Sequence, residues 1–234
     1  MQAVVLCGGL ATRMLPATRE MPKVLLPVAG KPFLHHLVMR LRAAGFVDIL
    51  LLAGHLAEPV QLAALAIGRD VSVVRDGPTL LGTAGALVAA RDRLAPSFLV
   101  TYGDSYLPFD YAGPLRALSL TPKDVLGAMA VWRNDDALEP SNTSIADGFV
   151  IRYDKRRSPG EPRLDHIDYG ATALKKEALA LVPEGEPAGL DALQAELAAK
   201  RRLAAFVTRQ RFYEIGSPDG LRALGAHLSP KDRA

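Results

Sequence analysis

Short apolar runs alternate with helical runs along the first half of this 234-residue chain, and this order constrains the fold more than any other feature. The apolar runs are rich in valine and leucine and fit strands that are buried on both faces. They cover Ala3–Leu6, Asp48–Ala53, Val71–Arg75 and Phe98–Thr101. Helical patterns fill the intervals, at Phe33–Ala44, Ala57–Ile67 and Gly82–Leu94. Strands separated by helices of this length predict βαβ units, and hence an α/β fold with a parallel sheet.

The second half of the chain is less regular, although it mixes the same two patterns. Its apolar runs predict strands at Val125–Trp132, Phe149–Tyr153, Ile167–Leu174 and Leu203–Val207. Its helical patterns lie at Gly113–Leu120, Leu190–Lys200 and Pro218–Leu228. Proline and glycine gather at 158–162 and 183–189, which we interpret as surface loops and not as domain boundaries. We therefore expect a single domain over residues 1–234.

Composition excludes several classes of protein. The chain has 28 basic and 25 acidic side chains, so its short basic clusters, Lys155–Arg157 and Lys200–Arg202, are interpreted as solvated faces and not as nucleic-acid contacts. The single cysteine, Cys7, cannot form an internal disulfide. No apolar run reaches the roughly 18 residues of a membrane span, and no secretory signal precedes the first strand. We expect a cytoplasmic protein without nucleic-acid or membrane partners; homo-oligomer formation is left open.

A glycine pair follows the first predicted strand, and two cations follow the pair. Gly8 and Gly9 are succeeded by Arg13 and by Lys23, which comes directly after Pro22. Ligands of open α/β sheets bind at the carboxyl ends of the strands, where such a loop presents backbone N–H groups and positive charge. The segment matches neither the dinucleotide fingerprint G-x-G-x-x-G nor the Walker A pattern. A plain turn would explain the glycines but not the cations, so we predict a polyphosphate ligand.

The stretch from Leu6 to Leu34 resembles the signature of sugar-1-phosphate nucleotidylyltransferases, which runs roughly G-G-x-G-T-R at the loop and P-K-x-L further on. The chain matches this signature at Gly8, Gly9, Thr12, Arg13, Pro16, Thr18, Pro22, Lys23, Leu25, Pro27, Gly30, Lys31 and Pro32. It departs from the signature at Ala11, where glycine is usual. A positive φ at that position would strain an alanine by roughly 1 kcal/mol or more.

Five later segments extend the resemblance over nearly the whole chain. They are Leu80–Leu87, Tyr102–Asp104, Asp154-Lys155, Ile167–Gly170 and Phe212–Pro218. The resemblance implies a Rossmann-like, three-layer αβα nucleotidyltransferase fold of GT-A-like type, with a mixed, mainly parallel central sheet. It also implies a nucleotide-binding half at about 1–110 and a sugar-phosphate-binding half at about 111–228. The chain shows no hexapeptide repeats, so we expect no C-terminal β-helix domain like that of longer members.

The resemblance also assigns roles to individual residues. Nucleotide binding is expected from Leu6, Gly8, Gly9, Thr12, Arg13, Lys23, Gly82 and Thr83, with Arg13 and Lys23 as the catalytic cations. Sugar-phosphate binding is expected from Tyr102, Asn142, Asp154, Lys155, Asp168 and Gly170. Mg²⁺ is expected as the cofactor, bound by Asp104 and by Glu214, which is one methylene longer than the usual aspartate. Mg²⁺ needs only one or two carboxylates beside phosphate oxygens.

The implied reaction transfers a nucleotidyl group from an NTP to a sugar 1-phosphate. Such chemistry depends on positioning and charge neutralisation. The loop together with Gly103-Asp104-Ser105 most resembles guanylyltransferases for heptose or mannose 1-phosphate, so GTP is favoured. Uridylyl- and thymidylyltransferases are the alternatives, as is a non-catalytic NTP- or sugar-sensing module on the same fold. A Rossmann oxidoreductase is disfavoured, because the second strand ends in Ala53-Gly54-His55 without a ribose-binding acid.

Overall fold

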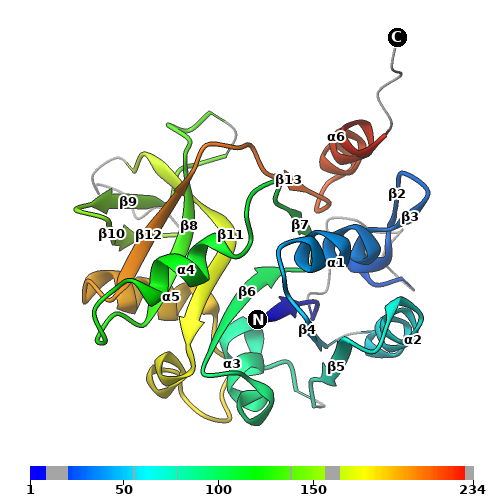
Figure 1. The fold of residues 1–234 in the computed structure, drawn as a ribbon, viewed down its shortest axis with the longest axis horizontal. Helices are drawn as coiled ribbons and strands as arrows, with labels where there is room; N and C mark the ends of the chain where they lie inside the picture. The colour runs from blue at the N-terminus through cyan, green and yellow to red at the C-terminus, as the bar shows by residue number, and fades with distance from the viewer. Residues whose placement is uncertain (9–20, 55, 78, 138, 156–163, 230–234) are drawn as a thin grey trace.

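The computed structural model describes residues 1–8, 21–54, 56–77, 79–137, 139–155 and 164–229. Within them, the main sheet has nine strands in the order β5-β4-β1-β6-β11-β8-β12-β10-β9 (Figure 1). Its first four members are β5 (Val71–Arg75), β4 (Asp48–Ala53), β1 (Gln2–Leu6) and β6 (Ser97–Tyr102). Neighbours among these four are parallel, so their carboxyl ends lie at one edge of the sheet.

The other strands of the main sheet pair differently. They are β11 (His166–Lys175), β8 (Gly127–Arg133), β12 (Leu203–Thr208), β10 (Phe149–Tyr153) and β9 (Thr143–Ala146). Strand β11 is antiparallel to β6 and β8, β12 is parallel to β8, and β10 is antiparallel to β12 and β9. The prediction of a mixed α/β sheet is confirmed. The prediction of mainly parallel pairing holds for the first four strands, whereas most pairs among the other strands are antiparallel.

The β9–β10 hairpin shows one physical reason for this difference. The two strands are joined by Asp147 and Gly148, whose φ values are 51° and 79°. A two-residue turn can close only an antiparallel pair, because a parallel connection needs a crossover of a dozen or more residues. The Asp-Gly pair is itself a hairpin signal, so the sequence offered a prediction of β9 that we did not make.

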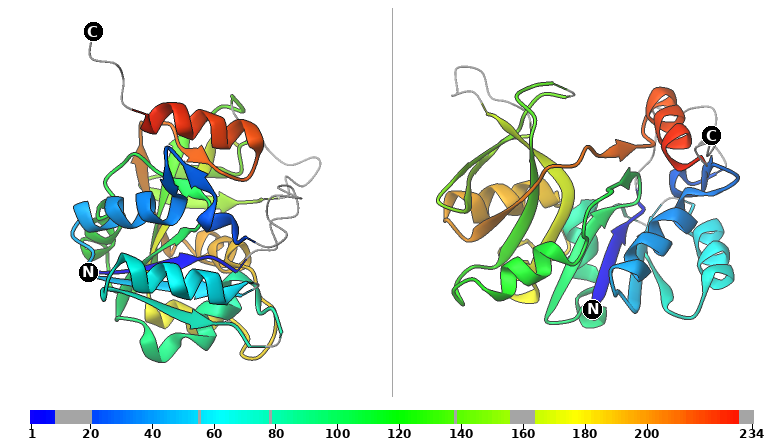
Figure 2. Two further views of the ribbon diagram at one scale, coloured as in Figure 1. Left: turned by 90° about the vertical axis from the view of Figure 1, so that its right-hand side faces the viewer. Right: turned by 45° about the horizontal axis from the view of Figure 1, so that its top comes forward.

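Helices cover both faces of the main sheet, which gives three layers (Figure 2). One face carries α1 (Phe33–Ala43), α2 (Ala57–Ile67), α4 (Gly113–Ser119) and α6 (Pro218–Leu228). The other carries α3 (Gly82–Ala89) and α5 (Leu190–Ala199). Short 3-10 helices lie at η2 (Lys23–Leu25), η3 (Arg91–Arg93) and η4 (Lys176–Leu181). The predicted helix Gly82–Leu94 is thus divided into α3 and η3.

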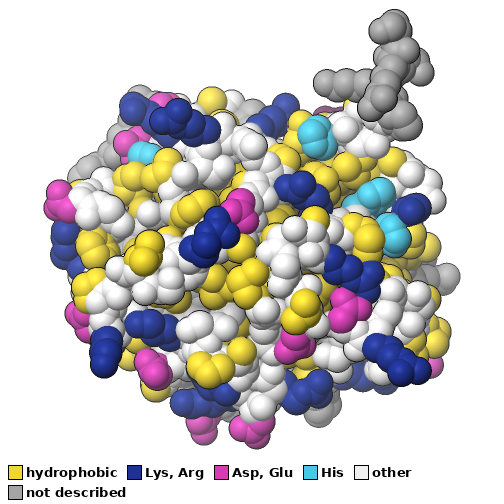
Figure 3. Space-filling view, viewed as in Figure 1, with side chains coloured by type: hydrophobic (Ala, Val, Ile, Leu, Met, Phe, Trp, Pro, Cys, Tyr) yellow, Lys and Arg dark blue, Asp and Glu magenta, His cyan; other side chains and the backbone are white. Residues whose placement is uncertain are grey.

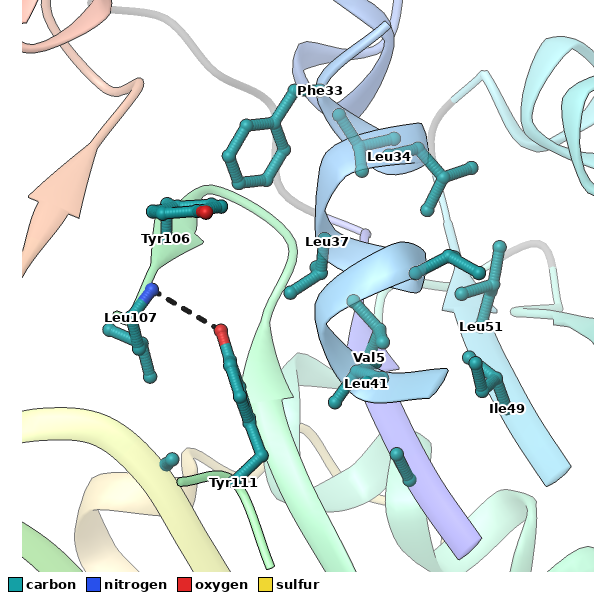
Figure 4. Packing of buried hydrophobic residues seen from close by; sticks show 14 of the residues in the cluster. Val5, Phe33, Leu34, Leu37, Leu41, Ile49, Leu51, Tyr106, Leu107 and Tyr111 are labelled. Carbon is teal, nitrogen blue, oxygen red and sulfur yellow. Dashed lines mark hydrogen bonds between the residues drawn. The ribbon is translucent and has the colours of Figure 1, made fainter. Parts of the chain in front are cut away.

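Side chains of the central strands point alternately into the two helical layers. In β1, Val5 packs in the cluster that holds Leu34 and Leu37 of α1 (Figure 4). Its neighbour Val4 packs in the other cluster, with Leu87 of α3. All five of these core side chains are fully buried. Because both faces of β1 are covered, its sequence is a continuous apolar run instead of an alternating one.

Two short ribbons lie outside the main sheet. In the first, β2 (Pro27–Val28) pairs with β3 (Lys31–Pro32). In the second, β7 (Ser105–Tyr106) pairs antiparallel with β13 (Tyr213–Glu214). The second ribbon joins the end of β6 to the segment that leads into α6, and it therefore brings distant parts of the chain together beside the carboxyl edge of the sheet.

The surface drawn in Figure 3 is mixed in charge. Among its described side chains, lysine and arginine are interspersed with aspartate and glutamate instead of gathering over one element. Apolar side chains are scattered between them. In the described part of the chain, none of the helices combines the length and the apolar character needed to cross a bilayer.

Candidate active site

A pocket of about 680 Å³ lies at the carboxyl ends of β1 and β6, and its volume falls within the range of small-molecule sites. The strand order sets its layout, because β5 and β4 lie on one side of β1 and β11 lies on the far side of β6. One end is mainly apolar, the middle is charged and the other end is polar. The main lining residues, in that order, are Leu6, Gly8, Leu52, Asp76, Leu80, Gly82, Thr83 and Ala86, then Lys23, Asp104 and Glu214, then Tyr102, Asn142, Tyr153, Lys155, Asp168 and Gly170.

The apolar end is built on the ends of β1, β4 and β5. The Asp76 N–H donates to the Ala53 carbonyl at 2.9 Å, which extends the β4–β5 ladder by one residue. A Cβ added at Gly54 would lie 2.8 Å from Asp76 Oδ2, and one added at Gly8 would lie 3.3 Å from the same oxygen. The two glycines therefore leave the space that the Asp76 carboxylate occupies. Burial raises the pKa of this carboxyl above its usual value.

Gly103 allows the ends of β1 and β6 to meet under the middle of the pocket. Its N–H donates to the Leu6 carbonyl at 2.9 Å. A Cβ at this position would lie 3.0 Å from both that carbonyl oxygen and Cys7 Sγ, which is closer than side chains approach. Burial raises the pKa of the Cys7 thiol to about 12, with a smaller contribution from the Asp104 charge. The thiol therefore stays protonated near neutral pH.

Lys23 and Asp104 form an ion pair in the middle of the pocket. Lys23 Nζ donates to Asp104 Oδ2 at 2.7 Å, and the two side chains are 20% and 40% exposed. Lys23 is the first residue of η2, and Pro22 before it has the extended backbone that precedes the turn. The other Asp104 oxygen, Oδ1, accepts from the Ser105 hydroxyl at 3.2 Å. Two residues that are 81 positions apart in sequence thus meet at the carboxyl edge.

Glu214 reaches the same pocket through the β7–β13 ribbon, where it lies opposite Ser105. Its carboxylate accepts hydrogen bonds from the Gly216 N–H and from the Ser217 hydroxyl, the latter at 2.6 Å. Ser217 is also the N-cap of α6 and accepts from the Gly220 N–H at 3.0 Å. A carboxylate is favourable at a helix N-terminus because it meets the positive end of the helix dipole. In this structure Glu214 therefore supports the start of α6.

The donor set in the middle of the pocket fits a magnesium ion. Mg²⁺ prefers carboxylate oxygens and takes one or two from the protein, completing its shell with phosphate and water. Asp104, in the turn between β6 and β7, and Glu214, on β13 beside β7, supply two such groups. Among the described residues, no group of three or more histidine, cysteine, aspartate and glutamate side chains forms a larger metal cluster. In this structure Lys23 pairs with Asp104 Oδ2, and Gly216 and Ser217 donate to Glu214, so these contacts would compete with a bound ion.

The polar end is organised around a buried carboxylate on β11. The register of β11 shifts between Asp168 and Thr172, and Gly170 within the shift has a φ of 89°. The Gly170 N–H donates to Asp168 Oδ1 at 2.9 Å, and the Tyr153 hydroxyl donates to Oδ2 at 3.4 Å. The Asp168 N–H donates to Asn142 Oδ1 at 2.8 Å. Burial raises the pKa of Asp168, while the Gly170 hydrogen bond and the Lys155 charge oppose the rise.

Comparison with protein families identifies a family for this chain. The model of the MobA-like NTP transferase domain matches residues 3–141, which is more than half of the chain. The chain belongs to the MobA-like NTP transferase family. The resemblance to sugar-1-phosphate nucleotidylyltransferases that the sequence suggested is thereby confirmed at the level of the family.

Curated relatives of this NTP transferase include members of two kinds. A bifunctional GlmU protein of Rhizobium johnstonii is 40% identical over 187 residues, which are 77% of this chain and 40% of that protein. A mannose-1-phosphate guanylyltransferase of Mycobacterium tuberculosis is 28% identical over 228 residues, which are 93% of this chain and 61% of that protein. The chain therefore spans about 40% of the length of the GlmU relatives that it matches.

Solved structures share the fold. HddC from Yersinia pseudotuberculosis, complexed with GMP-PN, is 25% identical and superposes with a TM-score of 0.78, covering 97% of this chain and 99% of that chain. A UDP-glucose pyrophosphorylase from Acinetobacter is 18% identical with a TM-score of 0.79, covering 98% and 94%. The second likeness supports the fold alone. Together they show that the chain has the Rossmann-like α/β fold of these proteins, as the sequence predicted.

Most of the site residues predicted for this NTP transferase line the one pocket, and three groups need comment. Gly9, Ala11, Thr12 and Arg13 lie outside the described residues, so the φ angle of Ala11 and the role of Arg13 stay predictions. Asp154 is absent from the described lining residues, and its carboxylate lies 3.5 Å from Arg152 instead. The Thr83 hydroxyl accepts from the Leu190 N–H at 2.7 Å and so connects α3 to the start of α5.

The pocket also contains residues that the sequence analysis missed. They include Cys7, Asp76, Glu139 and Tyr153. Leu80, Tyr169 and Phe212 also line the pocket; each lies in a segment that carries the family resemblance, although none was assigned a role. Asp76 was predictable, since it is an acid placed directly after a buried parallel strand, at the edge where ligands bind. Tyr153 ends a predicted strand, but nothing in its neighbourhood points to Asp168. Glu139 enters from a loop of the second half and has no sequence signal that we can name.

Proposed function

We propose that this NTP transferase moves a nucleoside monophosphate from an NTP, with GTP favoured, to a heptose or hexose 1-phosphate in a Mg²⁺-dependent reaction that releases pyrophosphate. The observation that supports this proposal best is the position of Lys23. It lies between the apolar and polar ends of one pocket and 2.7 Å from Asp104. A cation there faces the place where two phosphate groups must meet for transfer, and charge neutralisation is what such a reaction needs most.

The proposed reaction needs little acid–base chemistry from the protein. An oxygen of the sugar phosphate attacks the α-phosphorus of the NTP, and the bond from that phosphorus to pyrophosphate breaks. A phosphate monoester is already an anion near neutral pH, so no side chain has to remove a proton. The contribution of the protein is to hold the two substrates in line and to neutralise charge, which Lys23 does at the α-phosphate. The predicted partner of Lys23 on the pyrophosphate side is Arg13.

Mg²⁺ would bind at Asp104 and Glu214 and would neutralise part of the phosphate charge. The residues at the two ends then hold the organic parts of the substrates. At the apolar end, Leu80 and Gly82 offer a surface for the base. At the polar end, Asp168, Tyr153 and Lys155 offer hydrogen bonds for sugar hydroxyls and a positive charge for the sugar phosphate.

The choice of GTP and of heptose or hexose 1-phosphate draws support from two relatives. HddC was crystallised with GMP-PN, and the M. tuberculosis relative is named a mannose-1-phosphate guanylyltransferase. UTP and dTTP are the alternative donors, because the fold is shared with a UDP-glucose pyrophosphorylase.

A pyrophosphate-release assay tests the proposal. GTP, UTP, dTTP and CTP are each combined with mannose, heptose, glucose and N-acetylglucosamine 1-phosphates in the presence of Mg²⁺. We expect the highest kcat/KM for GTP with a heptose or mannose 1-phosphate. Highest turnover with UTP or dTTP would support the proposed nucleotidyl transfer but would replace GTP as the donor. If no pair turns over while an NTP still binds, the protein is a sensing module and the proposal is wrong.

A further inference from the structure

Two buried polar side chains, Thr101 and Gln194, hold the bulge in β11, and neither is among the described residues that line the pocket. Thr101 is the last residue of β6 that pairs with β11, and it is fully buried. Its hydroxyl donates to the Gly170 carbonyl at 2.9 Å. Gly170 comes just before the first residue of β11 in this ladder, so the hydroxyl extends the pairing of the two strands into the bulge.

Gln194 of α5 holds the other side of the bulge. Its side chain is 1% exposed, and its Nε2 donates to the Thr172 hydroxyl oxygen at 2.9 Å. Thr172 is the residue at which β11 resumes its pairing with β8. Thr101 lies on the same face of β6 as Leu99, which packs in the layer of α1. The bulge is therefore held from both helical layers of the fold.

Packing alone does not explain either side chain. The three residues before Thr101 on β6 are apolar and buried, and a valine would fill the same space without a hydroxyl to pair. Gln194 carries a further cost, because its Oε1 is buried and has no hydrogen-bond partner among the described residues. A methionine would pack there without an unpaired oxygen. Both residues keep a polar group in the core at the one place where β11 is irregular.

The bulge determines where the Asp168 carboxylate points. Between Asp168 and Thr172, β11 has three residues where β8 has only Ala130. Within this excess, Gly170 has a φ of 89°, and its N–H donates to Asp168 Oδ1 at 2.9 Å. Bulges of this kind re-aim side chains beside sites. Burial raises the pKa of Asp168, and the nearby Gln194 amide is among the groups that oppose the rise.

We propose that Thr101 and Gln194 are positioning residues for the sugar 1-phosphate, and that they fix the β11 bulge so that the Asp168 carboxylate faces the polar end of the pocket. This inference rests on the proposed function, since it requires a sugar 1-phosphate at that end. Both residues act through Asp168 and do not touch the substrate. The apolar end and Lys23 lie outside the bulge, so NTP binding and the transfer step should be little affected.

Steady-state kinetics of Thr101→Val test the inference, with the NTP and the sugar 1-phosphate varied in turn. The substrates are the pair that turns over fastest in the pyrophosphate-release assay. Valine keeps the shape of threonine and removes only the hydroxyl. We expect the KM for the sugar 1-phosphate to rise about three- to tenfold, as for the loss of one neutral hydrogen bond, with kcat and the KM for the NTP within about twofold of wild type. Thr101→Ser restores the hydroxyl and should return this KM to within about twofold of wild type.

Gln194→Met provides an independent variant, and Gln2→Met is its matched control. Gln194→Met should raise the same KM about three- to tenfold. The double variant with Thr101→Val should raise it by less than the product of the two single effects, because both release one bulge. Gln2 is also buried, and its Nε2 donates to Asp48 and to the Arg93 carbonyl, but it begins β1 at the edge opposite the pocket. Gln2→Met should lower the Tm and leave both KM values unchanged.

The contrary outcomes separate the inference from the proposed function. If Thr101→Val and Gln194→Met lower the Tm but raise neither KM, or raise both KM values equally, the two residues are structural and the inference is wrong while the proposed function stands. It is also wrong if Thr101→Ser does not restore the KM, or if neither Thr101→Val nor Gln194→Met folds; if one of them folds, that variant decides. If the wild-type protein turns over no pair of NTP and sugar 1-phosphate, the inference and the proposed function fail together.

Discussion

Asp76 and Asp168 are the same residue type at opposite ends of one pocket, and burial raises the pKa of both. They differ in what their oxygens already do. Asp168 accepts from the Gly170 N–H and from the Tyr153 hydroxyl, so both of its oxygens are used within the protein. Among the described residues, Asp76 has no such donors. Burial and charge alone therefore do not distinguish an acid that shapes a site from one that waits for a ligand; the donors around it do.

The largest effect is expected from the residue between the two acids. Lys23→Ala should lower kcat by about 10²- to 10³-fold, because it removes a charge that the transition state needs. Binding of GTP at the apolar end should change much less, since the base contacts remain. Steady-state kinetics and titration of GTP measure the two quantities separately. An unchanged kcat in a folded variant would remove Lys23 from the reaction.

At the polar end, Lys155→Met should raise the KM for the sugar 1-phosphate by about tenfold, the effect of losing a hydrogen bond to a charged group. The KM for the NTP should stay the same, because Lys155 lines the end opposite Asp76. Kinetics with each substrate varied in turn provide the measurement. Equal increases in both KM values would mean that the two ends do not act separately.

The thermal stability of Asp168→Asn tests whether the charge of this buried acid destabilises the folded protein. Burial raises the pKa of Asp168 in the folded protein, so ionisation at neutral pH destabilises the fold. This penalty is absent below the pKa of an unfolded aspartate, about 3.9, grows as pH rises to the raised value and stays constant above it. Asparagine cannot ionise and still accepts from the Gly170 N–H. We expect a higher Tm than wild type at pH 7 and a difference that shrinks on acidification. A Tm difference that is constant from pH 4 to pH 8 would show that Asp168 does not carry this penalty.

The smallest effect is expected for Glu214→Asp. Its carboxylate already has two donors at the start of α6, Gly216 and Ser217, so it resembles Asp168 more than Asp76. If it binds Mg²⁺, the shorter side chain keeps the hard oxygen ligands, and turnover should stay within about threefold of wild type or rise. Assays over a range of Mg²⁺ concentrations check this. Complete loss of activity at saturating Mg²⁺ in a folded variant would contradict the assignment.

The first half of the fold was predictable because its strands are buried on both faces. The continuous apolar runs predicted β4 and β5 with the ends that the structure shows. The helical pattern between them predicted the ends of α2 equally well. In the second half most strand pairs are antiparallel and several strands are partly exposed, and the four-residue strand β9 was missed. The two-residue turn between β9 and β10, Asp147-Gly148, is a local hairpin signal. A search for helices and parallel strands does not detect such a signal.

The candidate site was predictable where a segment of the family resemblance contains the residue, as for Lys23, Asp104 and Gly82. It was less predictable where a partner lies far along the chain. The orientation of Glu214 depends on the β7–β13 ribbon and on the cap of α6, neither of which a local pattern reveals. The sequence analysis assigned Asp154 to the sugar-phosphate site because it is next to Lys155 in the motif. The side chains of successive residues at the end of a strand point in different directions, so only one of the two reaches the pocket. Asp76 could have been predicted from its position after β5.

The ion pair between Lys23 and Asp104 matches these two charges before any substrate arrives. A polyanion that enters alone competes with Asp104 for the Lys23 ammonium, and a cation that enters alone competes with Lys23 for the Asp104 carboxylate. A polyanion and a cation that enter together can exchange partners with the pair, so that both charges stay matched. The pair therefore favours the binding of both ions together over the binding of either one alone.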